Sequence, residues 1–238
     1  MSAIVALHQV SKDYMLGKTR VQAVRNASLQ IQKGEFVSIV GPSGSGKTTL
    51  LNLIGCVDSP SSGSVIVHGQ DTRHLRDDAL ADIRLRHIGF IFQSFNLIPV
   101  VTLFRNVEFP LLLQGDLTRK ERHLRVMRLL ERTGLAAHAL HRPNELSGGQ
   151  RQRAAIARAL VTAPSLVLAD EPTANLDAEN GVMIVDLMRQ MNEREGVTFI
   201  FSTHDERVMW RATYVIRIED GKLREREESG VRRPPMRL

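Results

Sequence analysis

The distribution of hydrophobic residues along the chain predicts two kinds of region. Short runs of apolar and β-branched residues, several of them closed by Gly, Ser or Asn, are typical of strands. Two runs near the start, residues 4–10 and 21–31, alternate or carry β-branched residues, and a Lys-Gly turn follows the second. The other predicted strands are residues 36–40, 64–68, 88–92, 166–169, 197–202 and 214–218.

A helical period of about 3.6 replaces the strand pattern between residues 93 and 160. Within residues 118–133, the apolar residues Leu124, Met127 and Leu130 are three positions apart and predict one buried helix face. Further helices are predicted at residues 48–54 and 178–191. Strands alternating with helices indicate an α/β fold with a mostly parallel sheet, into which a helical lobe is inserted.

Composition narrows the class of protein. The length of 238 residues suits one large domain, and a net charge of +6 suits anionic partners such as nucleotides, nucleic acid or an acidic membrane face. A single cysteine, Cys56, excludes a disulfide framework and a cysteine-based zinc cluster. The N-terminal segment lacks the pattern of a secretory signal, and no apolar run approaches the ~20 residues of a membrane span. We therefore expect a chain that does not cross a membrane by itself.

A glycine-rich segment between a predicted strand and a predicted helix matches GxxxxGK[ST] in full. Its glycines allow the backbone to wrap phosphate oxygens, toward which the helix N-terminus and successive N–H groups point. Lys47 is expected to meet the β- and γ-phosphates, and the Thr48 hydroxyl to ligate Mg²⁺. The predicted phosphate-binding residues are Gly41, Pro42, Ser43, Gly44, Ser45, Gly46, Lys47, Thr48 and Thr49.

Two adjacent carboxylates end the predicted strand 166–169. One carboxylate at this place can hold a Mg²⁺ ion and its water shell, and the other can orient or deprotonate an attacking water. We assign Asp170 to the metal and Glu171 to the general base.

A second anion-binding helix start is predicted about a hundred residues after the first. Ser147 is a favourable N-cap before a strong helix former, and Gly148 and Gly149 permit close approach of the backbone. With Gln150 these residues read Leu-Ser-Gly-Gly-Gln.

Together, this segment, the phosphate loop and the segment LVLADEPTANLD resemble the nucleotide-binding domain of ATP-binding cassette (ABC) proteins, over residues 4–223. The resemblance implies an ATPase in which a mostly parallel sheet, an antiparallel β subdomain and a helical subdomain combine. It also implies a head-to-tail homodimer, with each ATP held between the phosphate loop of one copy and Ser147 to Gln150 of the other. The expected boundaries are a core of residues 1–92 and 161–223, a helical lobe of 93–160, and a mobile basic tail of 224–238.

The resemblance assigns four further positions. Gln93 matches the glutamine that contacts Mg²⁺ or the attacking water, and His204 matches the histidine that holds the γ-phosphate and positions Glu171. Asp177 matches the aspartate that links the two sites of the dimer. Tyr14 matches the aromatic residue that stacks on adenine, with a packed core aromatic as its alternative.

Several segments, among them residues 50–58 and 88–99, are similar to cassettes of the lipoprotein-releasing and macrolide-export type. This implies a separate four-helix permease as partner, and a peripheral location on the cytoplasmic face of the inner membrane. The apolar stretch after Gln93, up to Leu113, either stays exposed as a groove for that permease or packs the helical lobe.

Three alternatives remain for the function. A cassette that regulates cell division would share fold, permease type and ATPase activity. A cassette acting on nucleic acid usually carries tandem domains, coiled coils or zinc modules, so this partner is not expected. An inactive homologue is disfavoured by the presence of Lys47, Asp170, Glu171 and His204. The transported substrate and the direction of transport are not encoded in these motifs.

Overall fold

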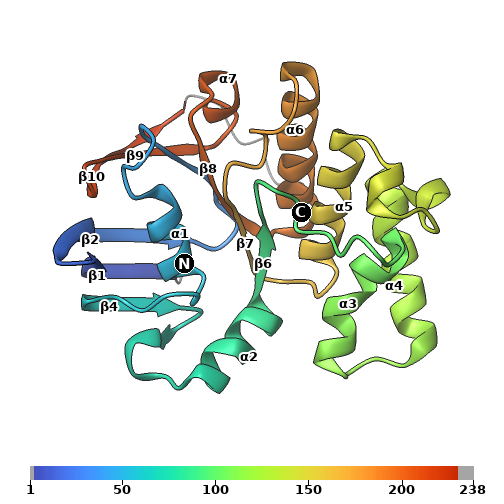
Figure 1. The fold of residues 1–238 in the computed structure, drawn as a ribbon, viewed down its shortest axis with the longest axis horizontal. Helices are drawn as coiled ribbons and strands as arrows, with labels where there is room; N and C mark the ends of the chain where they lie inside the picture. The colour runs from blue at the N-terminus through green and yellow to red at the C-terminus, as the bar shows by residue number, and fades with distance from the viewer. Residues whose placement is uncertain (1–2, 230–238) are drawn as a thin grey trace.

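Residues 3–229 are described by the structure, a computed structural model, with the exception of the side chains of Arg207 and Glu225. Its centre is a six-stranded sheet in the order β10-β9-β3-β8-β7-β6, parallel except for β10 (Figure 1). The strands are β3 (Phe36–Val40), β6 (Ile88–Ile91), β7 (Leu166–Ala169), β8 (Thr198–Thr203), β9 (Tyr214–Glu219) and β10 (Lys222–Glu228). The predicted mostly parallel sheet is therefore confirmed, with β3 and β7 at the predicted residues.

A second, antiparallel sheet lies at one side of the molecule, drawn in blue and cyan in Figure 1. Its order is β2 (Thr19–Gln32), β1 (Ala3–Leu16), β4 (Ser62–Val67) and β5 (Gln70–Asp71). The first two strands run beyond the predicted ranges because they form one long hairpin, whose register continues to the pair Leu16 and Thr19.

Helices cover the central sheet and form a group of their own at the side opposite the antiparallel sheet (Figure 1). The helices that flank the sheet are α1 (Lys47–Ile54), α2 (Asp77–His87), α6 (Ala178–Glu195) and α7 (Glu206–Met209). The separate group contains α3 (Leu103–Gln114), α4 (Arg119–Arg132) and the start of α5 (Gly148–Leu160), with short 3₁₀ turns at Ala136–His138 and Pro143–Glu145. A further 3₁₀ turn, Thr72–His74, follows β5 of the antiparallel sheet. None of the helices within residues 3–229 is both long and apolar enough to cross a bilayer.

The central sheet is buried on both faces, which explains why its strands read as continuous apolar runs. Along β8, Phe199 and Phe201 pack into the core shared with α3 to α6, whereas Ile200 packs into the core shared with α1 and the antiparallel sheet. Because strand side chains alternate between faces, one short segment supplies both cores. The sheet edge where β3, β7 and β8 end is thereby held rigidly.

Two expectations are corrected. The inward face of α4 is formed by Val126, Leu129 and Leu130, while Leu124 is 60% exposed. A spacing of three residues drifts by about 60° per step around a helix of 3.6 residues per turn, so the two steps from Leu124 to Leu130 span about 120° and Leu124 lies off the buried side. Only Leu130, and in part Met127, lie on the predicted face.

The second correction concerns the segment that was expected to be a mobile tail. Its first residues, 224–228, belong to β10, which pairs with β9. Backbone pairing and the ion pair of Arg226 with the buried Glu35 (2.7 Å) fix them in place. The remainder of the expected tail, residues 230–238, lies outside the described residues.

Candidate functional site

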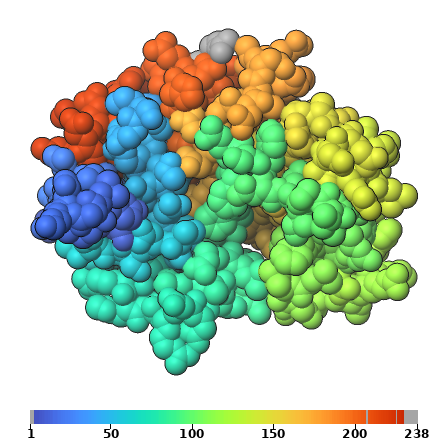
Figure 2. Space-filling model, viewed as in Figure 1, coloured from blue at the N-terminus to red at the C-terminus, as the bar shows by residue number. Residues whose placement is uncertain are grey.

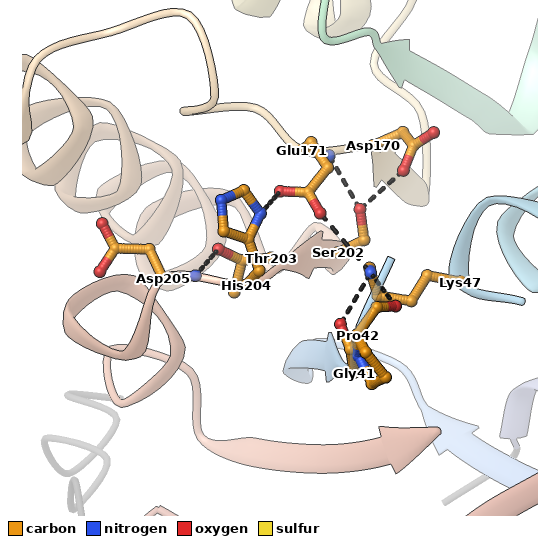
Figure 3. Close-up of polar contacts among 9 residues, drawn as sticks. All are labelled: Gly41, Pro42, Lys47, Asp170, Glu171, Ser202, Thr203, His204 and Asp205. Carbon is orange, nitrogen blue, oxygen red and sulfur yellow. Dashed lines mark hydrogen bonds and ion pairs between the residues drawn. The ribbon is translucent and has the colours of Figure 1, made fainter. Parts of the chain in front are cut away.

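The predicted phosphate loop, the two carboxylates and the histidine meet at one edge of the central sheet. The loop follows β3, Asp170 and Glu171 follow β7, and His204 follows β8, so all lie at the carboxyl ends of parallel strands (Figure 3). This edge is the usual ligand-binding position in open α/β sheets. A cavity of about 580 Å³ opens there, lined by Ala23, Ser43, Gly44, Gly46, Lys47, Thr48, Thr49, Gln93, Glu171, Ala174 and His204.

Two glycines of the loop are required by close backbone contacts. A Cβ on Gly41 would lie 2.1 Å from the carbonyl oxygen of Ile218, and one on Gly46 would lie 2.3 Å from that of Ala23. Gly46 also has a φ of +107° as the residue that precedes α1. The loop is therefore pressed between β9 and β2, and its backbone leads directly into the N-terminus of α1, which favours anions.

Lys47, Glu171 and His204 form a connected polar group at the floor of the cavity. The Lys47 ammonium donates hydrogen bonds to the carbonyl oxygens of Gly41 (2.8 Å) and Pro42 (3.0 Å) and lies 3.7 Å from the Glu171 carboxylate. The other oxygen of Glu171 is 2.9 Å from Nδ1 of His204 (Figure 3). Lys47 and Glu171 are 8% and 15% exposed, so these charges interact largely shielded from water.

Ser202 joins the two carboxylate residues, and the sequence analysis did not single it out. Its hydroxyl donates to Oδ1 of Asp170 (2.7 Å) and accepts from the backbone N–H of Glu171 (2.8 Å). Glu171 has a φ of +47°, an unfavourable conformation for a residue with a side chain. Ser202 is fully buried and lies two residues before His204. The pairing of β8 with β7 brings it beside Asp170 and Glu171, and the sequence alone does not reveal this pairing.

The donors expected for a metal are available in this geometry. Within residues 3–229, Oδ2 of Asp170, the Thr48 hydroxyl and the Gln93 side chain make no hydrogen bond, and Thr48 and Gln93 line the cavity. Gln93 is held through its backbone carbonyl, which accepts a hydrogen bond from Asn175 (2.8 Å). Three oxygen donors of the type that Mg²⁺ prefers thus remain uncommitted.

Tyr14 lies beside this cavity and not in its lining. Its hydroxyl is 2.7 Å from Oδ2 of Asp58, and a further hydrogen bond involves Thr49, which does line the cavity. Partial burial, followed by the hydrogen bond to Asp58, raises the pKa of Tyr14. The structure thus places the ring next to α1, and its stacking on a base stays a prediction.

The second predicted anion site lies at the N-terminus of α5, outside the cavity lining. Ser147 caps the helix as expected: its hydroxyl accepts from the Gln150 N–H (3.3 Å), and the Gln150 side chain accepts from the Ser147 N–H (2.8 Å). Gly148 and Gly149 follow in the first turn, where a Cβ on Gly149 would lie 3.0 Å from Asn180. Ser147 is exposed and Gly149 is buried, and the first turn of this helix contains no acidic residue.

Asp177 is engaged within the chain as the N-cap of α6. Its two carboxylate oxygens accept from the backbone (2.9 Å) and the side chain (2.6 Å) of Asn180, which lower its pKa. Its predicted role between two copies therefore stays a prediction.

A smaller hollow of about 220 Å³ lies between α2, α3 and α5. It is lined by Arg84, Leu85, Ile88, Gly89, Phe90, Phe92, Asn96, Pro110, Arg158, Ala159 and Thr162, and Figure 2 shows the molecule hollowed between the teal α2 segment and the green helices. Of the apolar stretch after Gln93, Leu97 packs on the core, while Val100 is 73% exposed. Phe109, Leu112 and Leu113 of α3 are also exposed. The stretch is thus packed in part and exposed in part, and a groove for a permease stays a prediction.

Comparison with known proteins agrees with the geometry. The family model described as ABC transporter matches residues 24–174. An ABC transporter ATP-binding protein of Thermotoga maritima is 46% identical over 231 residues, which cover 97% of this chain and 98% of that protein. The macrolide export ATP-binding/permease protein MacB of Bradyrhizobium diazoefficiens is 47% identical over 218 residues, but these represent 92% of this chain and only 33% of MacB.

Solved structures extend the comparison to the fold. The ATP-binding cassette MJ0796, from Methanocaldococcus jannaschii, was solved as a dimer in a post-hydrolysis state bound to ADP and Pi. It superposes with a TM-score of 0.87 at 45% identity, over 94% of this chain and 98% of that one. The chain belongs to the ABC transporter family and is an ATP-binding cassette, a nucleotide-binding ATPase subunit.

Proposed function

We propose that this cassette hydrolyses Mg-ATP at the interface of a head-to-tail homodimer and drives a membrane permease that is not contained in these residues. The observation that carries the proposal is the presence of two different anion sites in one chain. One is the cavity at the phosphate loop, and the other is the exposed, capped start of α5, which does not line that cavity. Two copies arranged head to tail would complete each cavity with the partner's Ser147.

Within each site, this chain's own residues bind and orient the nucleotide. The loop of residues 41–49 would wrap the phosphates, and Lys47 would exchange its carbonyl contacts for phosphate oxygens. Thr48, Asp170 and Gln93 would hold Mg²⁺, which when bound neutralises charge on the phosphates.

Glu171 is the proposed general base. His204 holds its carboxylate through a 2.9 Å contact, and Lys47 lies on its other side, so the carboxylate is aimed into the cavity. From there it would accept a proton from the attacking water. ATP bound by both copies would close the dimer through charge-assisted hydrogen bonds, and hydrolysis would remove this link.

The hollow between α2, α3 and α5 is the proposed contact with the permease. Its apolar wall continues into the exposed Phe109, Leu112 and Leu113, a patch that suits a partner helix. Arg158 of α5 crosses this hollow and donates to the carbonyl oxygens of Phe95 and Asn96, just after Gln93. The helix that Ser147 caps is thus hydrogen-bonded to the segment that follows Gln93.

The relatives support an export or extraction function. MacB is named a macrolide export ATP-binding/permease protein, and a Pseudomonas syringae relative is named a probable syringafactin export protein of the same kind. We propose a peripheral location at the cytoplasmic face of the inner membrane. We further propose that the ATP-binding domain divides into a core of residues 1–92 and 161–223 and a helical lobe of residues 93–160.

A co-purification experiment tests the proposal. Tagged Glu171→Gln chain is expressed in its own host, and the membranes are solubilised in mild detergent with Mg-ATP. A permease with four membrane helices and a large external domain is the expected partner, and Phe109→Asp is expected to lose it while retaining ATP binding. Leu140→Asp, a substitution at another exposed leucine (82%), is the matched control. Recovery of only water-soluble proteins or nucleic acid would overturn the transporter proposal.

A further inference from the structure

The hydroxyl group of Tyr14 is tied to the helix that follows the phosphate loop. Asp58 follows α1 after a short turn, in which the N–H groups of Val57 (2.9 Å) and Asp58 (3.2 Å) both donate to the Asn52 carbonyl. From this fixed position its Oδ2 contacts the Tyr14 hydroxyl at 2.7 Å, across 44 residues of sequence. The contact joins the antiparallel sheet to the phosphate-binding helix.

Lys12 completes a three-residue cluster. Its ammonium donates to Oδ1 of Asp58 (2.5 Å) and to the carbonyl oxygen of Ser59 (2.9 Å), and it lies 5.0 Å from the centre of the Tyr14 ring. The lysine side chain is only 13% exposed and that of Asp58 27%, so solvent weakens these interactions less than at an open surface. Lys12 thus holds the carboxylate and also occupies one face of the ring.

The backbone around Tyr14 is fixed by the same loop. The N–H of Ser61 donates to the carbonyl oxygen of Ser11 (2.8 Å), and the Ser61 hydroxyl accepts from the N–H of Asp13 (3.0 Å). The loop 58–61 therefore holds the main chain on the N-terminal side of Tyr14, at Ser11 and Asp13, and the tip of the Tyr14 side chain. A side chain that is already fixed in place loses little conformational entropy when a base packs on its ring.

We propose that Asp58, supported by Lys12, is a positioning residue that holds the Tyr14 ring as a preformed wall for the base of the nucleotide. This inference rests on the proposed nucleotide site and adds how that site recognises the base. The contact of Tyr14 with the loop 41–49, which binds the phosphates, is a hydrogen bond to Thr49 at the end of that loop, so the cluster is expected to act chiefly on the base. A ligand with the same phosphate chain and no base is therefore indifferent to it.

Equilibrium binding of ATP and of inorganic tripolyphosphate to the full chain, without divalent cations, tests this inference. Stacking on an aromatic side chain contributes about a tenfold or greater gain in affinity. Tyr14→Ala is expected to weaken ATP binding about tenfold or more, and Tyr14→Phe and Asp58→Ala about three- to tenfold, with tripolyphosphate binding unchanged. The double variant Tyr14→Phe/Asp58→Ala is expected to lose less than the product of the two single losses, because both single variants remove the hydrogen bond between Tyr14 and Asp58.

The matched control is Arg20→Ala. It removes the neighbouring ion pair of the same hairpin, Arg20 with Asp13 (2.6 Å), without touching the Tyr14 hydroxyl. It should leave both affinities unchanged, and Asp58→Asn, which retains an acceptor, should recover part of the lost ATP affinity.

The outcomes separate this inference from the proposed function. If Tyr14→Ala leaves ATP and tripolyphosphate binding unchanged, the proposed stacking itself is wrong. If Tyr14→Ala weakens ATP selectively while Tyr14→Phe and Asp58→Ala do not, only the positioning role of Asp58 is overturned. Equal losses for both ligands would mean a general defect of the loop and would also overturn it. Tyr14→Phe removes a single oxygen, so it keeps the test valid should Asp58→Ala fail to fold.

Discussion

The two anion sites of this chain differ in how their side chains are held. At the phosphate loop, Lys47, Glu171 and His204 are connected to one another at the ends of three parallel strands. At the start of α5, Ser147 and Gln150 cap each other's backbone, the Gln150 side chain also contacts the nearby His138 ring (3.1 Å), and Ser147 is exposed. The first site is assembled from distant segments by the sheet, whereas the second is assembled locally by four consecutive residues.

This difference has a mechanistic consequence. A site built from a sheet can hold buried charges and tune them for chemistry, because neighbouring strands fix every partner. A helix start needs no tertiary partner to present N–H groups to an anion. In the proposed dimer, the chain would therefore carry out its chemistry at the phosphate loop and present the start of α5, a simpler anion site, to another copy. Four experiments test this difference between the two anion sites.

The largest effect is expected at Glu171. Glu171→Gln removes the proposed base and should lower the ATPase rate by about 10²- to 10⁴-fold, since general bases contribute this much. ATP binding should persist, and light scattering should detect an ATP-dependent dimer. Glu179→Gln, at an exposed acid in the first turn of α6, is the control. Normal hydrolysis by Glu171→Gln would remove this residue from the mechanism.

A smaller loss of ATPase activity is expected when the anion site at the start of α5 is blocked. Ser147→Arg should reduce the ATPase rate about 10²-fold, as for loss of one transition-state donor, and leave ATP binding intact. Mixing it with Lys47→Ala should restore part of the activity, because one composite site of the mixed dimer then has both intact halves. If the mixture remains inactive while the two chains still form mixed dimers, the head-to-tail arrangement is contradicted.

The site at the phosphate loop should be sensitive to its buried hydroxyl. Ser202→Ala removes two hydrogen bonds, one to the Asp170 carboxylate, and should lower kcat about tenfold with little change in ATP affinity measured without divalent cation. Ser38→Ala is the matched control: this serine is equally buried in the adjacent strand β3, and its hydroxyl is 3.5 Å from the Met209 carbonyl oxygen. Equal kcat values for Ser202→Ala and Ser38→Ala would show that the Ser202 hydroxyl contributes only to packing.

The smallest effect is expected on stability, where substitutions of Ser147 separate its role as a helix cap from its proposed role toward phosphate. Ser147→Ala should lower the free energy of unfolding by about 1 kcal/mol, the usual contribution of an N-cap. Ser147→Asp should preserve stability, since Asp caps as well as Ser, and lose ATPase activity because its carboxylate repels phosphate. Urea denaturation with parallel ATPase assays measures both. Retained activity in Ser147→Asp would contradict the approach of a phosphate to this residue.

The sequence predicted the central sheet well because its strands are buried on both faces and therefore read as unbroken apolar runs. It predicted α4 but not its buried side, since Leu124 and Val126 are equally apolar and only packing against α3 and α5 decides between them. The strand β10 was missed because its charged sequence, with residues such as Arg226 and Glu228, suits an edge strand and a solvated tail alike.

The residues of the phosphate loop and of the α5 start could be predicted because each motif is contiguous, and its anion-binding geometry follows from local backbone conformation. Glu171 and His204 required in addition the assumption that their strands are neighbours. Ser202 and Asp58 carry no local signal, since a serine in a strand and an aspartate in a turn are common.

The α/β class, the two helix starts that favour phosphate and the carboxylates after a buried strand all follow from the amino-acid sequence. That Ser202 bridges Asp170 and Glu171, and that Asp58 holds Tyr14, follows from the folded arrangement of the chain. The two groups of features differ in the range of the interactions behind them. Helix capping and glycine conformation act within about four residues, whereas these bonds join residues that only strand pairing and the packing of α1 bring within reach.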